Sequence, residues 1–212
     1  MKNMMLLLSF ITLSSPVFAE ERLESEIVRI QHDWAIANYL TPKDAQESAF
    51  KSLTEEAHQV TVSNPNAPEA LIWEGITFSG YAKAKGGIGA LKLAEKARDL
   101  LLTAEKINPQ VLQGSTYTSL GSLYYKVPGW PIGFGDKKKA RTYLEKALAA
   151  NPTGIDPNYF YADFLSEQGD YVKAVEYYKK ALAAPARQGR EDADIGRKKE
   201  VEEGLSVAER KV

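Results

Sequence analysis

Residues 156–185, DPNYFYADFLSEQGDYVKAVEYYKKALAAP, carry a helical pattern from which the fold of this chain is predicted. Apolar residues recur at helical spacing on one face of each half, namely Tyr161, Ala162 and Leu165, and then Ala174, Tyr178 and Ala181. Gly169 and Asp170 stand between the halves, where glycine suits the end of one helix and aspartate the cap of the next. The stretch predicts two antiparallel helices that cross closely at their small alanines.

Asn-Pro dipeptides divide the rest of the chain at regular intervals. They occupy positions 64–65, 108–109 and 151–152, so the prolines are 44 and then 43 residues apart, and Pro185 follows 33 residues after the last. Because proline disfavours a helical conformation of the residue before it, each dipeptide marks the end of a helix. Helix ends at a nearly fixed period indicate a repeat protein, in which stacked helical hairpins form an extended surface.

Two further units share the spacing of the hairpin at 156–185. The matching residues are Tyr117, Leu120, Gly121, Tyr124, Ala140, Leu144 and Ala147 before Pro152, and Leu71, Gly75, Phe78, Ala97, Leu101 and Ala104 before Pro109. The pattern resembles the tetratricopeptide repeat (TPR) family, whose signature contains Leu-Gly and a later Tyr, then alanine and a closing proline. The last unit departs from it, with Asn158 at the opening aromatic position and Tyr161-Ala162 for Leu-Gly. The resemblance implies an all-α, right-handed superhelical stack of hairpins.

The chain is expected to divide into a leader and three structural parts. These are an N-terminal helical hairpin at 20–65, three TPR-like repeats at 66–109, 110–152 and 153–186, and a C-terminal capping helix at 187–212. Two repeats exceed the usual 34 residues, with seven extra residues near 127–135 and about ten near 82–91. Insertions in a helical stack form loops on one edge, which is often the binding edge.

Residues 1–19 have the layout of a secretory signal peptide. Lys2 precedes an apolar run from Met4 to Leu13, and Val17-Phe18-Ala19 places small residues before a cleavage point. The run is too short to span a bilayer, which takes roughly 20 residues; a buried first helix is the alternative interpretation. We expect cleavage after Ala19, export of the mature chain, to the periplasm in a bacterium, and no membrane span.

Composition excludes several classes of function. The chain has no cysteine, which leaves no disulfide, thiol nucleophile or thiolate metal site. The formal net charge is −1, and charges of both signs are interspersed. Without a basic stripe along the sequence, neither nucleic acid nor anionic lipid is indicated as a partner.

Residues suited to catalysis are few and scattered. His32 and His58 lack a second ligand at metal-binding spacing and are expected to be ordinary helical histidines. The glycines at 86–89 could offer backbone N–H groups to an anion, but the stretch lacks the Gly-Lys-Ser/Thr continuation of a nucleotide site and favours a turn between helices. No G-x-S-x-G motif is present. We expect a protein that is not an enzyme and has no cofactor and no metal.

The insertion VPGWPIGFG, residues 127–135, places two large aromatic residues between prolines and glycines. Proline restricts the backbone and glycine allows sharp bends, so an ordered loop is predicted. An aromatic residue in a loop either anchors it to the body or contacts a partner, and Trp is enriched at binding hot spots. Both can hold here, with Ile132 and Phe134 as anchors and Trp130 facing outward.

The first helices of the repeats are expected to line an inner groove. Its predicted residues are Ile72, Ile76, Ser79, Thr118, Ser122, Tyr125, Tyr159, Asp163 and Glu167. The lysines and asparagines with which chaperone-binding TPR proteins hold a carboxylate are absent from this series, so an acidic C-terminal peptide is not the expected ligand. The residues expected to contact a partner or ligand are Tyr125, Trp130, Phe134, Tyr159 and Asp163.

These patterns favour a non-catalytic, periplasmic interaction module that binds a protein partner or an extended ligand in its inner groove. Residues 124–136 also resemble a stretch of exported bacterial repeat proteins, some of them the T component of tripartite substrate-binding transporters. That resemblance implies an alternative, a transporter-associated accessory protein that holds a small organic ligand in a groove closed by the Trp130 loop. An open groove favours the first function, and an enclosed apolar pocket favours the second.

Overall fold

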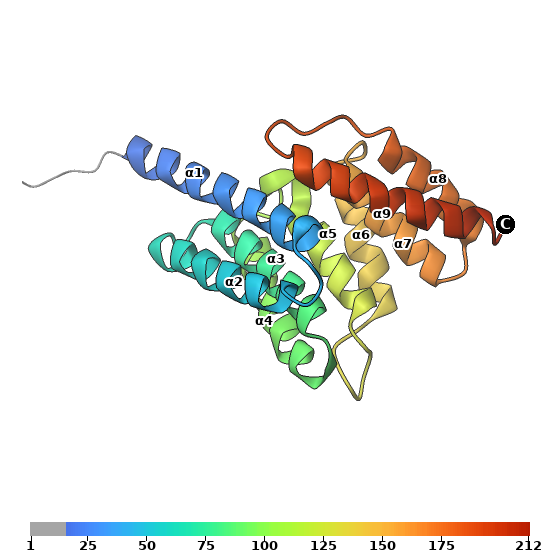
Figure 1. Ribbon diagram of the computed structural model, residues 1–212, viewed down its shortest axis with the longest axis horizontal. Coiled ribbons are helices and arrows are strands. Elements are labelled where there is room, and N and C mark those ends of the chain that lie inside the picture. Colours follow the sequence, from blue (N-terminus) through green and yellow to red (C-terminus); the bar gives the residue numbers. More distant parts are fainter. Residues whose placement is uncertain (1–15) are drawn as a thin grey trace, which may run out of the picture.

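The computed structural model describes residues 16–212, and these residues form helices joined by turns and loops (Figure 1). The helices are α1 (Pro16–Ala35), the single π-helical turn η1 (Ile36–Leu40), α2 (Gln46–Ser63), α3 (Pro68–Lys85), α4 (Gly87–Ile107), α5 (Val111–Lys126), α6 (Lys137–Ala150), α7 (Ile155–Glu167), α8 (Tyr171–Leu182) and α9 (Glu191–Glu209). The predicted all-α stack of helical hairpins is confirmed. None of these helices combines the length and the hydropathy needed to cross a bilayer.

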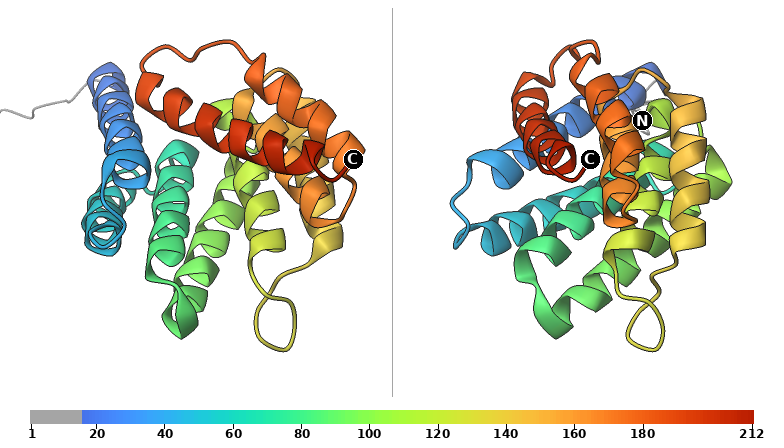
Figure 2. Two further views of the ribbon diagram at one scale, coloured as in Figure 1. Left: turned by 45° about the vertical axis from the view of Figure 1, so that its right-hand side comes forward. Right: turned by 90° about the vertical axis from the view of Figure 1, so that its right-hand side faces the viewer.

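The helices pair in chain order and the pairs stack side by side (Figure 2). The three repeat hairpins are α3 with α4, α5 with α6, and α7 with α8. Their first helices α3, α5 and α7 also contact one another in sequence, and α2 packs against α3. The first helices therefore form one continuous wall, on which the inner surface of the stack is built.

Small residues hold the two helices of each hairpin close together. A Cβ atom added at Gly75 would lie 2.9 Å from Leu101 Cγ, and one at Gly121 would lie 2.7 Å from Leu144 Cγ. Ala162 takes the equivalent position in the last hairpin and is fully buried. Any larger side chain at these positions would push the hairpin apart, since packed cores have no room for it.

The two insertions behave differently: the one near 82–91 keeps the predicted glycine turn between helices but forms no longer loop. The extra residues there lengthen α3 and α4, and the turn is confined to Gly86 and Gly87, whose φ angles are +62° and +61°. Alanine and lysine on both sides of this turn are strong helix formers, so the helices continue until two glycines allow a left-handed bend. Residues 127–135 do form a loop, in which the Gly135 N–H donates to the Pro128 carbonyl at 2.9 Å.

The C-terminal helix α9 does more than cover the end of the stack. It packs along α8 and α7, and it also reaches α1 and η1 at the other end of the chain (Figure 2). Tyr39 of η1 lies against Gly196 of α9, where an added Cβ would be 2.3 Å from the ring. The N- and C-terminal helices thus meet across the inner side of the stack. The predicted leader lies largely outside the described residues, and its expected cleavage point after Ala19 falls within α1.

Candidate functional site

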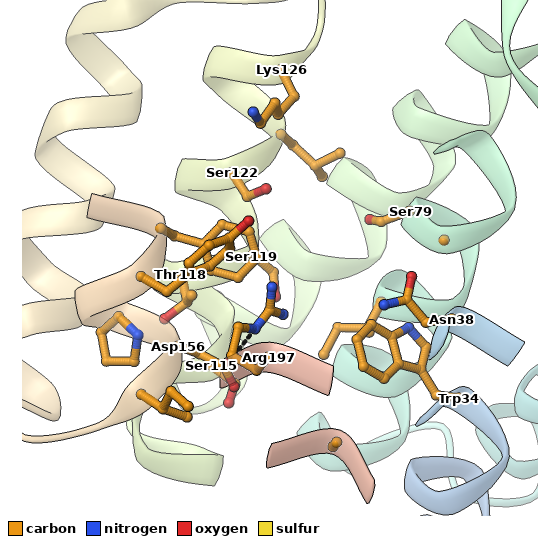
Figure 3. Close-up of a pocket in the computed structure, with 18 of the residues that line it drawn as sticks. Trp34, Asn38, Ser79, Ser115, Thr118, Ser119, Ser122, Lys126, Asp156 and Arg197 are labelled. Atoms are coloured by element: carbon orange, nitrogen blue, oxygen red, sulfur yellow. Dashed lines mark hydrogen bonds and ion pairs between the residues drawn. The ribbon is translucent and has the colours of Figure 1, made fainter. Parts of the chain in front are cut away.

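Helices α1, α3, α4, α5, α7 and α9 surround a cavity of about 1620 Å³ on the inner side of the stack (Figure 3). Ordinary ligand sites occupy roughly 300–1,000 Å³, so this cavity has room for an extended ligand. Ile88 and Ile132 contribute to its lining while being 98% and 70% exposed, so they mark the rim where it opens to solvent.

One wall of the cavity is a row of hydroxyl groups on α5. Ser115, Thr118, Ser119 and Ser122 follow one helical face, and Lys126 continues the row (Figure 3). The Ser115 hydroxyl donates to the Leu112 carbonyl at 2.7 Å. The other three hydroxyls form no hydrogen bond with any residue in the described part of the chain, and they line the cavity. They remain available to a ligand.

Aromatic side chains form much of the remaining wall. Trp34 of α1 packs edge-on against Trp73 of α3 and Tyr39 of η1, with ring centroids 6.4 Å and 5.7 Å apart. Asn38 and Ser79 lie across from the hydroxyl row (Figure 3). The cavity therefore offers a ligand hydrogen-bonding groups on two facing walls and aromatic surface beside one of them.

A charged cluster lies at the end of the cavity formed by α7 and α9. The Asp156 carboxylate receives Arg187 Nη1 at 2.6 Å and Arg197 Nε at 2.8 Å. Burial alone would raise the pKa of Asp156, but the attraction of Arg197 and Arg187 outweighs it and lowers the pKa to about 2. Arg197 also stacks on the Tyr159 and Phe160 rings, at 4.5 Å and 4.7 Å.

The same cluster ties α9 to η1. Arg197 Nη1 contacts Glu200 Oε2 at 2.5 Å, and the Tyr39 hydroxyl donates to that oxygen at 3.1 Å. Nearby, the Arg190 guanidinium lies 5.1 Å from the centre of the Trp73 ring. Burial, together with the positive charge of Arg187, lowers the pKa of Arg190 to about 10. These contacts hold α9 across the groove and fix the shape of the cavity.

A second polar group joins α5 to α7 nearer the rim. Lys126 Nζ lies 2.7 Å from Asp163 and 2.5 Å from Glu167. The Tyr125 hydroxyl donates to Asp163 Oδ2 at 2.7 Å. Burial raises the pKa of Tyr125, and the Asp163 charge adds to the effect. Asp163 is therefore fully engaged in holding two first helices together.

The structure brings three of the five predicted contact residues together and leaves two apart. Tyr159 and Asp163 line the cavity, and Tyr125 is buried behind them. Phe134 packs edge-on against Tyr124 at 5.8 Å, under Arg98 at 4.5 Å, and does not line the cavity. Trp130 is 90% exposed in the loop, also outside the lining. Phe134 thus anchors the loop, while Trp130 faces solvent.

The predicted groove series is correct for most of its members. Ile76, Ser79, Thr118, Ser122, Tyr159 and Asp163 line the cavity. Ile72 is fully buried in the core, and Glu167 lies outside the lining, paired with Lys126. The sequence reasoning missed Ser115 and Ser119, although their helical spacing to Thr118 and Ser122 was a usable signal.

The element that closes the groove is also different from the one in the alternative prediction. Helix α9 spans it, whereas the 127–135 loop contributes only Val127, Pro128 and Ile132 to the rim. Neither Trp34 nor Arg197 of α9, nor Arg187 and Arg190 just before that helix, could be placed in the cavity from the sequence. Their positions depend on contacts between the two ends of the chain, which no local pattern encodes.

Each of the two histidines lies beside a carboxylate. His58 Nδ1 lies 2.9 Å from the buried carboxylate of Glu74, and His32 Nδ1 lies 3.7 Å from Asp192. Within residues 16–212, no three His, Cys, Asp or Glu side chains gather closely enough to hold a metal ion.

Comparisons with known proteins agree with this architecture. Residues 132–191 match the tetratricopeptide repeat family model. A thermophilic TPR protein in Thermus thermophilus has a similar structure, with a TM-score of 0.57, 16% identity, and coverage of 90% of this chain and 94% of that one. The protein MamA has a TM-score of 0.46 and 20% identity, over 80% of this chain and 92% of its own. No curated protein matches the chain.

Together, the matched segment and the stack of hairpins define the class of protein. Residues 132–191 match the tetratricopeptide repeat family, and the described part of the chain has the fold of a TPR protein. This class of fold serves as a scaffold for protein interactions.

Proposed function

We propose that this protein is an exported, non-catalytic binding protein whose inner cavity holds an extended segment of a partner protein. The observation that supports this most directly is the row of available hydroxyls at Thr118, Ser119 and Ser122 along the cavity wall. A chain in extended conformation exposes its backbone N–H and C=O groups, and a row of hydroxyls can donate to and accept from them.

The length of the row sets the size of the ligand. With a rise of 1.5 Å per residue, the α5 face from Ser115 to Lys126 is roughly 16 Å long. An extended chain advances about 3.3 Å per residue, so this wall matches about five residues of a partner. Aromatic side chains such as Trp34 and Tyr159 would cover the apolar side chains of that segment.

Site-specific crosslinking tests this proposal. A photoreactive amino acid at Ser119 should capture a partner segment in cells, whereas the same group at Val172, which is 68% exposed on α8, should not. Ser119→Trp should fill the cavity and abolish capture by a group placed at Ser122, with an unchanged melting temperature. Equal capture at Ser119 and Val172 would refute a specific site in the cavity.

A small organic ligand is the second candidate, and the closure of the groove by α9 favours it. The contact between Tyr39 and Gly196 closes one side of the space, whose lining includes Trp34, Trp73 and Tyr159, and concave sites with aromatic walls suit small ligands. This would suit a transporter-associated accessory protein. Native mass spectrometry of the purified protein separates the candidates, because a small ligand would add a discrete mass that Ser119→Trp removes.

Export is the remaining part of the proposal, and the layout of residues 1–19 supports it. The mature protein is then expected to begin at Glu20. The intact mass of the protein recovered from its native source measures this directly. A mass that includes Met1–Ala19 would contradict cleavage.

A further inference from the structure

Three strongly exposed apolar side chains project at one end of the molecule. Ile88 is 98% exposed at the α3–α4 turn, while Trp130 and Ile132 are 90% and 70% exposed in the 127–135 loop. The turn and the loop extend in the same direction in every view (Figures 1 and 2). They also touch, since a Cβ added at Gly133 would lie 3.1 Å from Leu91 Cδ1 of α4. We call Ile88, Trp130 and Ile132 the apolar tip.

Lysines stand next to the apolar tip, one turn further into the body. Four exposed lysines follow its turn and loop along α4 and α6, namely Lys92, Lys137, Lys138 and Lys139. None of them forms a salt bridge with another residue in the described range. The only acidic residue at 86–93 or 127–139 is Asp136, whose carboxylate accepts the N–H groups of Lys138 and Lys139 as a helix cap.

We propose that this end of the protein docks on a bilayer containing anionic phospholipids. The apolar tip enters the interface between headgroups and acyl chains, where Trp is favoured because its ring is apolar and its N–H is polar. The four lysines lie at headgroup level and pair with phosphates, each contributing electrostatic attraction. The docking requires no membrane-spanning helix and holds whether or not the cavity binds a protein segment.

Charge complementarity favours an anionic lipid surface over a second copy of the chain as the partner of this end. The chain as a whole has a formal charge of −1, yet this end carries four lysines without an ion-pair partner in the described chain. A second copy of the chain would bring like charges together at a twofold contact, which is unfavourable. Lys137, Lys138 and Lys139 are consecutive in the sequence, but Lys92 belongs to another hairpin, and only the fold brings the two insertions and their lysines to the same end.

The site of docking has a consequence for the cavity. Ile88 and Ile132 belong both to the apolar tip and to the cavity rim. Docking therefore turns the rim toward the bilayer, so that a ligand at the membrane surface meets the opening.

Vesicle flotation of the full-length protein tests the proposal. Vesicles of phosphatidylglycerol and phosphatidylethanolamine should carry the protein, and vesicles of phosphatidylcholine alone should not. Replacing both Lys137 and Lys138 by Gln should lower the partition coefficient roughly twentyfold, on the scale of one lysine pair at a charged surface. Trp130→Ser combined with Ile88→Ser should lower it about tenfold or more.

Two matched variants serve as controls. Val172→Ser removes an apolar side chain of similar exposure on α8, and Lys51→Gln removes an exposed lysine on α2; both should float like the unmodified protein. Equal flotation with neutral vesicles, or no loss in the tip variants, would overturn the proposal. So would a protein that ignores vesicles but self-associates through Trp130 in sedimentation velocity, since the occupant would then be a second copy.

Discussion

The hairpin crossings and the closure by α9 are two kinds of packing in one molecule. Gly121 and Leu144 lie on neighbouring helices in the same repeat, and the contact is apolar and fully buried. Tyr39 and Gly196 come from opposite ends of the chain, and the contact is surrounded by arginines and carboxylates. The first kind builds the stack, whereas the second shapes the cavity. A change at a hairpin crossing should therefore cost more stability than a change at the closure, whereas a change at the closure should alter the cavity.

The largest expected effect is at a hairpin crossing. Leu144 is fully buried where α6 meets Gly121 of α5, so Leu144→Ala should leave a cavity and lower the free energy of unfolding by about 2–5 kcal/mol. Urea denaturation measures this change. A loss below about 1 kcal/mol would mean that the packing of Leu144 against Gly121 contributes little to the stability of the hairpin.

The sequence predicts this first kind of packing well, for a physical reason. Gly75, Gly121 and Ala162 each lie in the same repeat as the helix they pack against, so residues close in the sequence determine each crossing. The closure has no such signature, because Gly196 meets Tyr39 only after the whole stack has formed. The candidate site was predictable where it lies on first helices, as at Ser122 and Asp163, and hidden where α1 and α9 supply it.

A smaller effect is expected in the charged cluster, and it should depend on pH. The folded pKa of Asp156 is about 2, below its ordinary 3.8, so its ion pairs stabilise the fold fully above about pH 4 and lose that contribution as the pH falls toward 2. Asp156→Asn should lower the free energy of unfolding by up to about 2 kcal/mol at neutral pH.

The pH profile is the decisive measurement for Asp156. The difference between the unmodified protein and Asp156→Asn should shrink between pH 4 and pH 2, since protonation removes the same charge. Asp170→Asn is a matched control on the adjacent helix cap, where the partner is an exposed lysine. A pH-independent difference would show that the loss comes from packing and not from the ion pairs.

A substitution at the contact between Gly196 and Tyr39 should cause only a modest loss of stability. Gly196→Ala places a methyl group against the Tyr39 ring, so α9 must shift away from η1, at a cost of about 1–2 kcal/mol. Hydrogen exchange should become faster in α1 and η1 but not in the α5–α6 hairpin. Gly204→Ala is the matched control on the same helix, because it faces Tyr178 of α8. If Gly196→Ala and Gly204→Ala speed hydrogen exchange at the same amides, the two contacts of α9, with η1 and with α8, open together as one cooperative unit.

The smallest effect on stability is expected at Trp130, and it separates anchoring from contact. Because the side chain is 90% exposed, Trp130→Ala should change the free energy of unfolding by no more than about 0.5 kcal/mol. Phe134 packs on Tyr124 beneath Arg98, so Phe134→Ala should cost about 1–2 kcal/mol, the scale of a partly buried aromatic ring. Melting curves of the two variants, recorded beside vesicle binding, test whether Phe134 anchors the loop and Trp130 contacts the surface.

Phe134→Ala should weaken vesicle binding only as far as it releases the loop. A loss of stability at Trp130 equal to that at Phe134 would mean that Trp130 packs against the body, and a surface role for the apolar tip would then have to rest on Ile88 and Ile132 alone.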